Sequence, residues 1–187
     1  MKNLLSMPGR TRKLNRGAAL DFREFQGRLW TLNHGAVLIE RLTDAGETGL
    51  RLALPGDWIG VEDFCGLPPS TGLSALMDCR LSVFSTAQVP PMSEMVIHLL
   101  HQHQRSADHL LALRTGSVAQ RLEVLLGIVR TGSQKPLLQW RAEDLPALRH
   151  IALLLDIAPE TACRSLAQMR ATPTAHPAPR QTRLAQA

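Results

Sequence analysis

The sequence predicts an α+β fold in which a layer of antiparallel strands comes first, a long helix follows and a small helical unit ends the chain. Three observations predict it. Hydrophobic residues alternate with polar ones over short stretches from Leu29 to about Ser85, the spacing becomes helical after Pro90 and Pro91, and two short helical patterns near the end lie three residues apart. The chain has 187 residues, 44% hydrophobic and 20% charged, so it can bury one sizeable core.

The strand region is divided by turn residues at 44–46, 55–57 and 68–72, where Gly, Pro, Asp and Ser gather. Between these turns Leu50, Leu52 and Leu54 alternate with Arg51, which the pattern places on the polar side. This spacing indicates seven or so short strands in an antiparallel sandwich or barrel. No clear helix precedes Leu29, so we expect the strand layer to begin there.

The long helix is expected from about Ser93 to Thr115. One set of its residues is spaced alternately four and three apart, as in the seam of a coiled coil. This seam consists of Val96, Leu100, His103, Ala107 and Leu110. A second copy of the chain is the natural partner for such a seam, so we expect a homodimer. The alternative is that the stripe packs on the strands of its own chain.

A second helix is expected at 118–132, a short extended piece at 137–140, and two short helices at about 146–155 and 159–170. The last two are separated by a tight connection, which predicts a helix-turn-helix. Ala152 is small enough to let the two helices approach, and apolar residues form an inner side. These apolar residues are Ile151, Leu155, Ile157, Ala162 and Leu166.

The outer face of the second short helix carries Glu160, Arg164 and Gln168, each four residues from the last. A carboxylate, a guanidinium and an amide are the groups that read cytosine, guanine and adenine in the major groove. We therefore expect these three side chains to contact bases, and Arg149 and Thr161 to contact phosphates. The alternative is an ordinary helical hairpin with a solvated polar face.

Charge is concentrated at the two ends of the chain. The formal net charge is +5, yet residues 1–16 and 161–187 contain no acid, so the central part is net acidic. Basic ends suit an acidic partner such as double-stranded DNA. The apolar runs are too short to span a membrane and nothing marks the chain for export, so we expect a cytoplasmic protein with no membrane contact.

The order of these parts resembles the cyclic-AMP receptor protein / fumarate-nitrate-reduction regulator (CRP/FNR) superfamily over about residues 28–170. The segments that carry the resemblance are LWTLNHGAVLI, LPGDWIG, the long helix, RLEVLLGIV and HIALLLDIAPETACRSLAQM, the last matching the E-T-V-x-R signature of the family. The resemblance implies a homodimeric transcription regulator. Its expected parts are a jelly-roll-type, cyclic-nucleotide-binding-like β-roll at 1–90, a dimerisation helix at 91–116, a helix-turn-helix DNA-binding domain at 117–172, and a loose basic tail at 173–187.

The chain departs from the family pattern at the effector site. Cyclic-nucleotide binders of the family carry a Glu after the glycine of G-D-x-x-G and an Arg-Ser or Arg-Thr dipeptide about ten residues later. This chain offers Gly60 and Glu62, then Ser70 and Thr71 without the arginine, and Ser106 on the long helix. An anionic nucleotide buried without a cationic partner is costly. We therefore expect no dependence on cyclic AMP, and an effector of unknown chemistry, either a small molecule or a protein.

Two further departures concern the DNA-binding unit. Asp156 stands where such units commonly have Gly, and Asp tolerates the left-handed backbone conformation better than most residues. The winged-helix type adds a β-hairpin after the second helix, but residues 171–187 do not read as strands. We therefore expect the wing to be missing. A dimeric ligand- or protein-binding roll that has lost sequence-specific DNA binding is the alternative function.

Metal and catalytic chemistry are not expected. Cys65, Cys79 and Cys163 form no CxxC pair, so we expect three buried, inert thiols. His101 and His103 copy the H-x-H of cupin metalloenzymes, but residues two apart on a helix point about 200° apart and cannot chelate one ion. A zinc site completed across a dimer and a pH-sensing role for His103 in the seam are minor alternatives. No cofactor is predicted.

Overall fold

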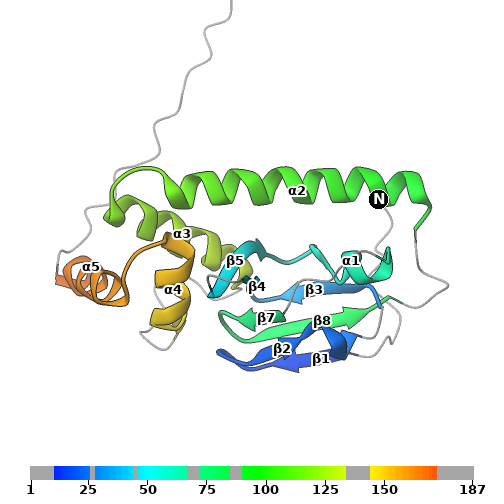
Figure 1. Cartoon of the computed structure of the whole chain (residues 1–187), viewed down its shortest axis with the longest axis horizontal. Helices are drawn as coiled ribbons and strands as arrows, with labels where there is room; N and C mark the ends of the chain where they lie inside the picture. Colours follow the sequence, from blue (N-terminus) through cyan, green and yellow to red (C-terminus); the bar gives the residue numbers. More distant parts are fainter. Residues whose placement is uncertain are drawn as a thin grey trace, which may run out of the picture.

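The computed structural model describes residues 11–25, 28–43, 46–66, 72–84, 90–133 and 144–171. Eight strands in these ranges form two four-stranded antiparallel sheets, packed as a β-roll (Figure 1). The first sheet has the order β1 (Thr11–Leu14), β8 (Cys79–Val83), β3 (Trp30–His34) and β6 (Trp58–Ile59). The second has the order β2 (Ala19–Asp21), β7 (Gly72–Ala75), β4 (Val37–Thr43) and β5 (Gly46–Ala53).

The expectation that the strand layer begins near Leu29 is wrong. Strands β1 and β2 come before it, and β1 pairs with β8 from Thr11 opposite Ser82 to Leu14 opposite Cys79. A short 3-10 helix, η1 (Phe22–Phe25), follows β2. Strand β1 could not be recognised from the sequence because Leu14 is its only buried residue, so the segment shows no alternation of apolar and polar residues.

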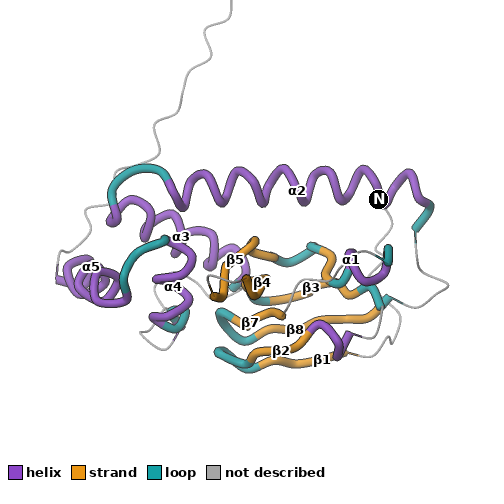
Figure 2. Tube along the Cα trace, in the orientation of Figure 1, coloured by secondary structure: helices purple, strands orange, loops and turns teal. Residues whose placement is uncertain are grey.

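Five α-helices occur in the described ranges (Figure 2): α1 (Val61–Phe64), α2 (Met92–Arg114), α3 (Val118–Gly132), α4 (Leu148–Leu155) and α5 (Pro159–Ala171). The last four agree with the expected helices to within about two residues. A capping box starts α3, since Ser117 accepts a hydrogen bond from the backbone of Gln120 and the Gln120 side chain accepts one from the backbone of Ser117. The expected extended piece at 137–140 and the tail from 172 onward lie outside the described residues.

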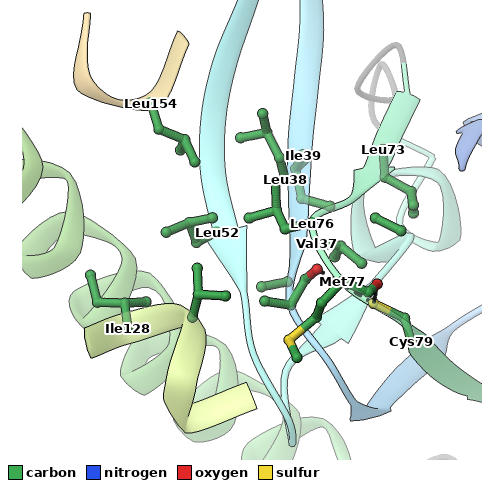
Figure 3. Close-up of a cluster of buried hydrophobic side chains, with 14 of the residues drawn as sticks. Val37, Leu38, Ile39, Leu52, Leu73, Leu76, Met77, Cys79, Ile128 and Leu154 are labelled. Carbon is green, nitrogen blue, oxygen red and sulfur yellow. Dashed lines mark hydrogen bonds between the residues drawn. The ribbon is translucent and has the colours of Figure 1, made fainter. Parts of the chain in front are cut away.

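One hydrophobic core joins the roll to the helices. Leu38, Ile39 and Leu52 from the second sheet meet Ile128 of α3 and Leu154 of α4 in a single buried cluster (Figure 3). Helix α2 runs along one side of the molecule, over α3 at one end and over the strands at the other (Figure 1). The helical unit is therefore fixed to the roll by packing, and not only by the chain connection.

A close backbone approach adds to this attachment. The N–H of Gly35, in the β3–β4 turn, donates a hydrogen bond to the carbonyl of Gly132 at the end of α3, at 2.9 Å. Gly35 has φ +97°, a conformation that favours glycine. No helix in the described ranges is long and apolar enough to cross a membrane.

The cysteines differ from expectation. Only Cys79 is buried, while Cys65 and Cys163 are exposed. Cys79 is in a central strand, where its Sγ lies 3.0 Å from the carbonyl of Met77 and 3.4 Å from that of Ala36. Burial raises the pKa of Cys79 to about 11, so this thiol stays protonated. Cys65 follows the short helix α1, and Cys163 lies on the solvent side of α5, so neither position has a layer to cover it.

Candidate functional site

Helices α4 and α5 form a compact pair joined by a short loop (Figure 2). Helix α4 ends at Asp156, whose backbone is left-handed at φ 53° and ψ 56°. The N–H of Ile157 donates to the carbonyl of Ala152 at 3.1 Å, which closes the end of the helix. Asp156 thus adopts the left-handed conformation that Asp tolerates better than most residues, and Pro159 starts α5, as its fixed φ suits.

The predicted inner side of this pair is confirmed. Ala152 of α4 and Ala162 of α5 are both buried, at 5% and 0% exposure, in the same apolar cluster. Ile151 and Leu155 are buried as well, while Ile157 is half-buried, as is Leu166 of α5. The helices are therefore held together by an apolar contact as well as by the chain.

The predicted outer face is open to solvent. Glu160, Arg164 and Gln168 are exposed, and Thr161 is half-buried. Within the described part of the chain, neither Glu160 nor Arg164 takes part in an ion pair. Helix α5 lies at one end of the molecule, beyond α3 and α4 and away from the strands (Figure 1). The structure thus presents one face of α5 outward with a carboxylate, a guanidinium and an amide in line.

Two arginines hold the turn between α4 and α5. Arg114, in the last turn of α2, forms an ion pair with Asp156 at 2.7 Å. Arg121 of α3 donates to the carbonyl of Leu155, also at 2.7 Å. On α4, Arg149 is exposed, and its Nε lies 3.1 Å from Nε2 of the buried His150. The orientation of α5 is therefore set from two other helices.

Helix α2 is apolar on its outer side. Of the predicted seam, Val96 and Leu100 are 47% and 63% exposed, His103 and Ala107 are also exposed, and Leu110 is half-buried. Further large apolar side chains extend this exposed surface: Met92, Ile97 and Leu111. We call the surface formed by these eight residues the α2 outer face. The alternative that the seam packs on the strands of its own chain is wrong.

The side of α2 that does face its own chain is partly polar. Met95, Gln102, Ser106 and Leu113 are its buried residues. Gln102 and Ser106 are 5% and 6% exposed. The helix therefore has buried polar side chains facing its own strands and exposed apolar side chains facing solvent, the reverse of an ordinary surface helix.

A cavity of about 220 Å³ lies between the roll and this inner side. It is lined by Arg51, Val61, Glu62, Leu99, Gln102, His103 and Ser106. Two predicted effector residues, Glu62 and Ser106, are thus brought together. Gly60 precedes α1 with φ +81° and does not line the cavity, and Ser70 and Thr71 lie outside the described residues.

Arg51 corrects the sequence analysis. Alternation placed it on a polar side, and the effector site was expected to lack a guanidinium. The side chain instead lies in the cavity, where burial lowers the pKa of Arg51 while the carboxylates of Glu62 and Asp57 favour its charged form. At Arg51 the polar side of β5 faces α2, which the alternation alone does not reveal.

Comparison with known proteins identifies the fold to which this geometry belongs. No family model and no curated protein matches the sequence. Three solved structures are similar to it: a CRP-family transcriptional regulator from Thermus thermophilus (21% identity, TM-score 0.63), a CRP/FNR-family regulator from the same organism (20%, 0.59), and FixK2 from Bradyrhizobium japonicum (17%, 0.58). They cover 86–88% of this chain and 84–86% of their own. The chain has the CRP/FNR fold. Because each match spans the strands and the helices together, the likeness extends beyond the β-roll.

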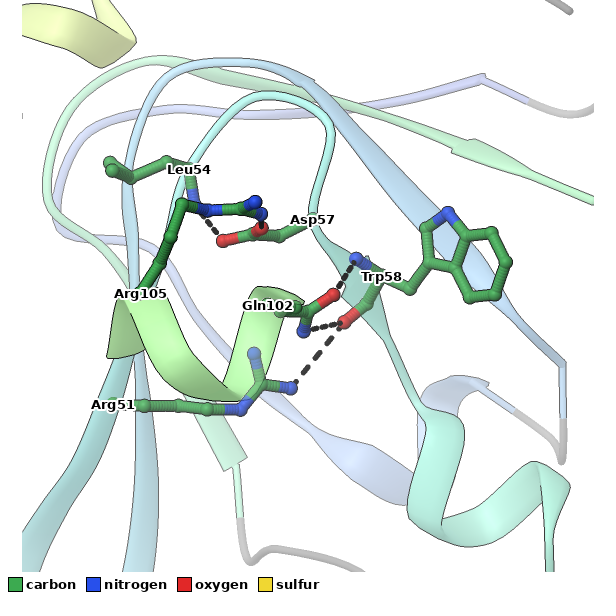
Figure 4. A network of polar contacts seen from close by, with 6 residues as sticks. All are labelled: Arg51, Leu54, Asp57, Trp58, Gln102 and Arg105. Carbon is green, nitrogen blue, oxygen red and sulfur yellow. Dashed lines mark hydrogen bonds and ion pairs between the residues drawn. The ribbon is translucent and has the colours of Figure 1, made fainter. Parts of the chain in front are cut away.

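In this CRP/FNR fold a polar network joins the roll to α2 (Figure 4). The side-chain amide of Gln102 accepts from the N–H of Trp58 at 2.8 Å and donates to its carbonyl at 2.9 Å. Arg51 donates to the same carbonyl at 3.4 Å. The buried Asp57 accepts from the N–H of Leu54 at 2.9 Å and pairs with Arg105 of α2 at 2.5 Å. The β5–β6 turn is thus tied to the middle of α2.

Aromatic packing extends the same contact. The imidazole of His98 stacks on Trp58 with ring centroids 4.1 Å apart, and Phe84 forms a T-shaped pair with Trp58 at a centroid distance of 5.3 Å. Burial lowers the pKa of His98. Within the described ranges no three His, Cys, Asp or Glu side chains come together as a metal site would require.

Proposed function

We propose that this chain is a DNA-binding transcription regulator of the CRP/FNR type, acting in the cytoplasm without catalysis. The observation that carries the proposal is the exposed outer face of α5. Glu160, Arg164 and Gln168 are exposed on this face, where we expect them to contact base edges, and we expect Thr161 and Arg149 to contact phosphates. The buried Ala152 and Ala162, in the core shared by α4 and α5, and the arginines behind the turn support one orientation of this face.

The α2 outer face supports a homodimer. Exposed apolar side chains along most of a long helix are costly in water, and a two-fold axis along α2 lets the same surface cover itself. The two α5 helices of such a dimer would enter successive major grooves about 34 Å apart and read a palindromic operator. The part boundaries at residues 90, 116 and 172 belong to this proposal, with α2 as the dimerisation helix.

The proposal includes independence from cyclic AMP, and it rests on the size of the cavity and on Glu62 rather than on a missing cation. Arg51 supplies the cation whose absence was expected, so charge alone does not exclude an anion. The cavity, at about 220 Å³, is below the roughly 300–1,000 Å³ typical of sites for drug-sized ligands. Glu62 also places a carboxylate in the same small space. These features favour a ligand smaller than a nucleotide.

A mobility-shift assay on genomic fragments at two salt concentrations tests the proposal, since a specific reader keeps a preferred site as salt rises. Arg164→Ala is expected to cost about 1–3 kcal/mol on the preferred site and much less on random DNA. Arg149→Ala should weaken both about equally. Arg80→Ala removes one exposed charge from β8, far from α5, and should change neither.

Equal losses on both DNAs for Arg164→Ala would show that α5 does not read bases. A dimer with no preferred fragment would favour the alternative, a ligand- or protein-binding roll that has lost DNA recognition. The dimer itself is tested by Leu100→Glu, which should give monomers in sedimentation, because two carboxylates would be buried at the axis. Gln104→Glu, an exposed polar position on the same helix, is its matched control.

A further inference from the structure

The cavity between the roll and α2 holds two opposite charges that do not satisfy each other. Nη1 of Arg51 and Oε2 of Glu62 are both shielded from solvent, and neither has a hydrogen-bond partner. Among the described residues these two side chains make no ion pair, although the Glu62 carboxylate lies near enough to favour the charged form of Arg51. Buried charged groups are stable when each is hydrogen-bonded.

A ligand with only one charge can satisfy either Arg51 or Glu62, but not both. An anion would satisfy the guanidinium of Arg51 but face the carboxylate of Glu62, and a cation would do the reverse. A molecule with an acceptor group on one side and a charged donor on the other satisfies both. The two charges must also sit close together, because the cavity is only about 220 Å³.

The remaining walls allow a short side chain. Val61 and Leu99 are apolar, while the hydroxyl of Ser106 and the imidazole of His103 are polar. We propose that this cavity binds a free α-amino acid, its carboxylate on Arg51 and its ammonium on Glu62. The inference deepens the proposed function, on which it rests, by naming the chemical class of the effector.

The ligand would touch the elements that connect the roll to α2. Arg51 and Gln102 line the cavity and both donate to the carbonyl of Trp58, so a carboxylate on Arg51 competes with one of these two hydrogen bonds. His103 belongs both to the cavity wall and to the α2 outer face. A bound amino acid therefore contacts the surface through which the second copy is proposed to pack.

Calorimetric titration of the full chain with each proteinogenic α-amino acid, without DNA, tests the inference. At least one is expected to bind at millimolar concentration or below. The tightest binder is then compared with analogues lacking the ammonium or the carboxylate, for leucine isocaproate and isoamylamine. Each analogue should bind at least about tenfold more weakly, because it loses a charge-assisted hydrogen bond to a buried partner. Cyclic AMP should not displace the amino acid.

Two variants test the roles of the Arg51 and Glu62 charges separately. Arg51→Gln should abolish amino-acid binding. Glu62→Gln should remove the preference for the ammonium, so that the carboxylate analogue binds as tightly as the amino acid. Arg80→Gln and Glu123→Gln, exposed positions outside the cavity, are the matched controls and should bind like the wild type. If Arg51→Gln fails to fold by circular dichroism, the altered preference of Glu62→Gln still decides.

The inference is overturned if no amino acid binds, if the wild type takes the carboxylate analogue as tightly as the amino acid, or if Glu62→Gln leaves the preference unchanged. Displacement by cyclic AMP would overturn it as well. The mobility-shift assay is run without amino acid, so a failure of DNA recognition and a failure of this site give separate results.

Discussion

Alanine at Gly132 is expected to destabilise the protein by detaching α3 from the roll. A Cβ built on Gly132 would lie 2.3 Å from the carbonyl oxygen of Gly35 and 2.7 Å from its carbonyl carbon. These are backbone atoms, so the two segments must separate, at about 1–3 kcal/mol for overpacking. The hydrogen bond from Gly35 to the Gly132 carbonyl, worth about 0.5–1.5 kcal/mol, is strained at the same time.

Alanine is favoured over glycine in a helix by about 0.5–1 kcal/mol, so these contributions give a net loss of about 0.5–4 kcal/mol for Gly132→Ala, centred near 2 kcal/mol. Gly127→Ala in the same helix is the matched control, because its Cβ meets nothing within 4 Å. It should stabilise by about 0.5–1 kcal/mol. Urea unfolding followed by circular dichroism measures both. A Gly132→Ala protein as stable as the wild type would refute the close approach of α3 to the β3–β4 turn.

Three other predictions are cheaper to test. A thiol reagent at neutral pH should modify Cys65 and Cys163 in the native protein and Cys79 only after denaturation, since burial raises the pKa of Cys79 to about 11. Operator DNA should protect only Cys163. Fast labelling of all three thiols in the native protein would contradict the burial of Cys79. Burial lowers the pKa of His98 from 6.5, so the unfolded state takes up a proton at a higher pH than the folded state, and the melting temperature should fall as the pH drops below about 6.5. His98→Gln should show a smaller fall, and an equal pH dependence in the wild type and the variant would reject His98 as the cause. Asp156→Gly should keep its stability while Asp156→Ala loses about 1 kcal/mol, because only glycine is free of the left-handed penalty, and equal unfolding midpoints would show that the turn is not left-handed.

The helices and the α4–α5 pair could be predicted because their signals are local. The small Ala152, the apolar inner side and the exposed outer face of α5 each follow from residue spacing within about twenty positions, and a helix of known period fixes which residues share a side. The strand β1 could not be predicted, because pairing with β8 joins residues far apart in the sequence. Its own composition shows only Leu14 as a buried residue.

Of the residues that line the cavity, Glu62 and Ser106 could be predicted from the sequence, whereas Arg51 and Gln102 could not, because their burial depends on contacts between distant parts of the chain. Period-two alternation says that Arg51 and Leu52 point to opposite sides of a strand, but not what covers each side. Here α2 lies over the side of Arg51, so a residue expected in water is half-buried and its Nη1 is shielded from solvent. Gln102 was hidden by its chemistry, because a search for apolar spacing passes over a buried amide whose partner is the backbone of Trp58, 44 residues away.

Helix α2 connects the parts of the proposed regulator through contacts of unequal strength. Gln102 holds it to the roll by two buried hydrogen bonds, while the ion pair between Arg114 and Asp156 joins it to the α4–α5 turn with the acid 79% exposed. An exposed pair contributes about 0–1 kcal/mol, whereas the apolar contact of Leu154 with the roll is fully buried. Moving α5 away from its own roll would therefore open the core. In the proposed dimer, turning one whole chain against the other would change the separation of the two α5 helices while leaving this core closed.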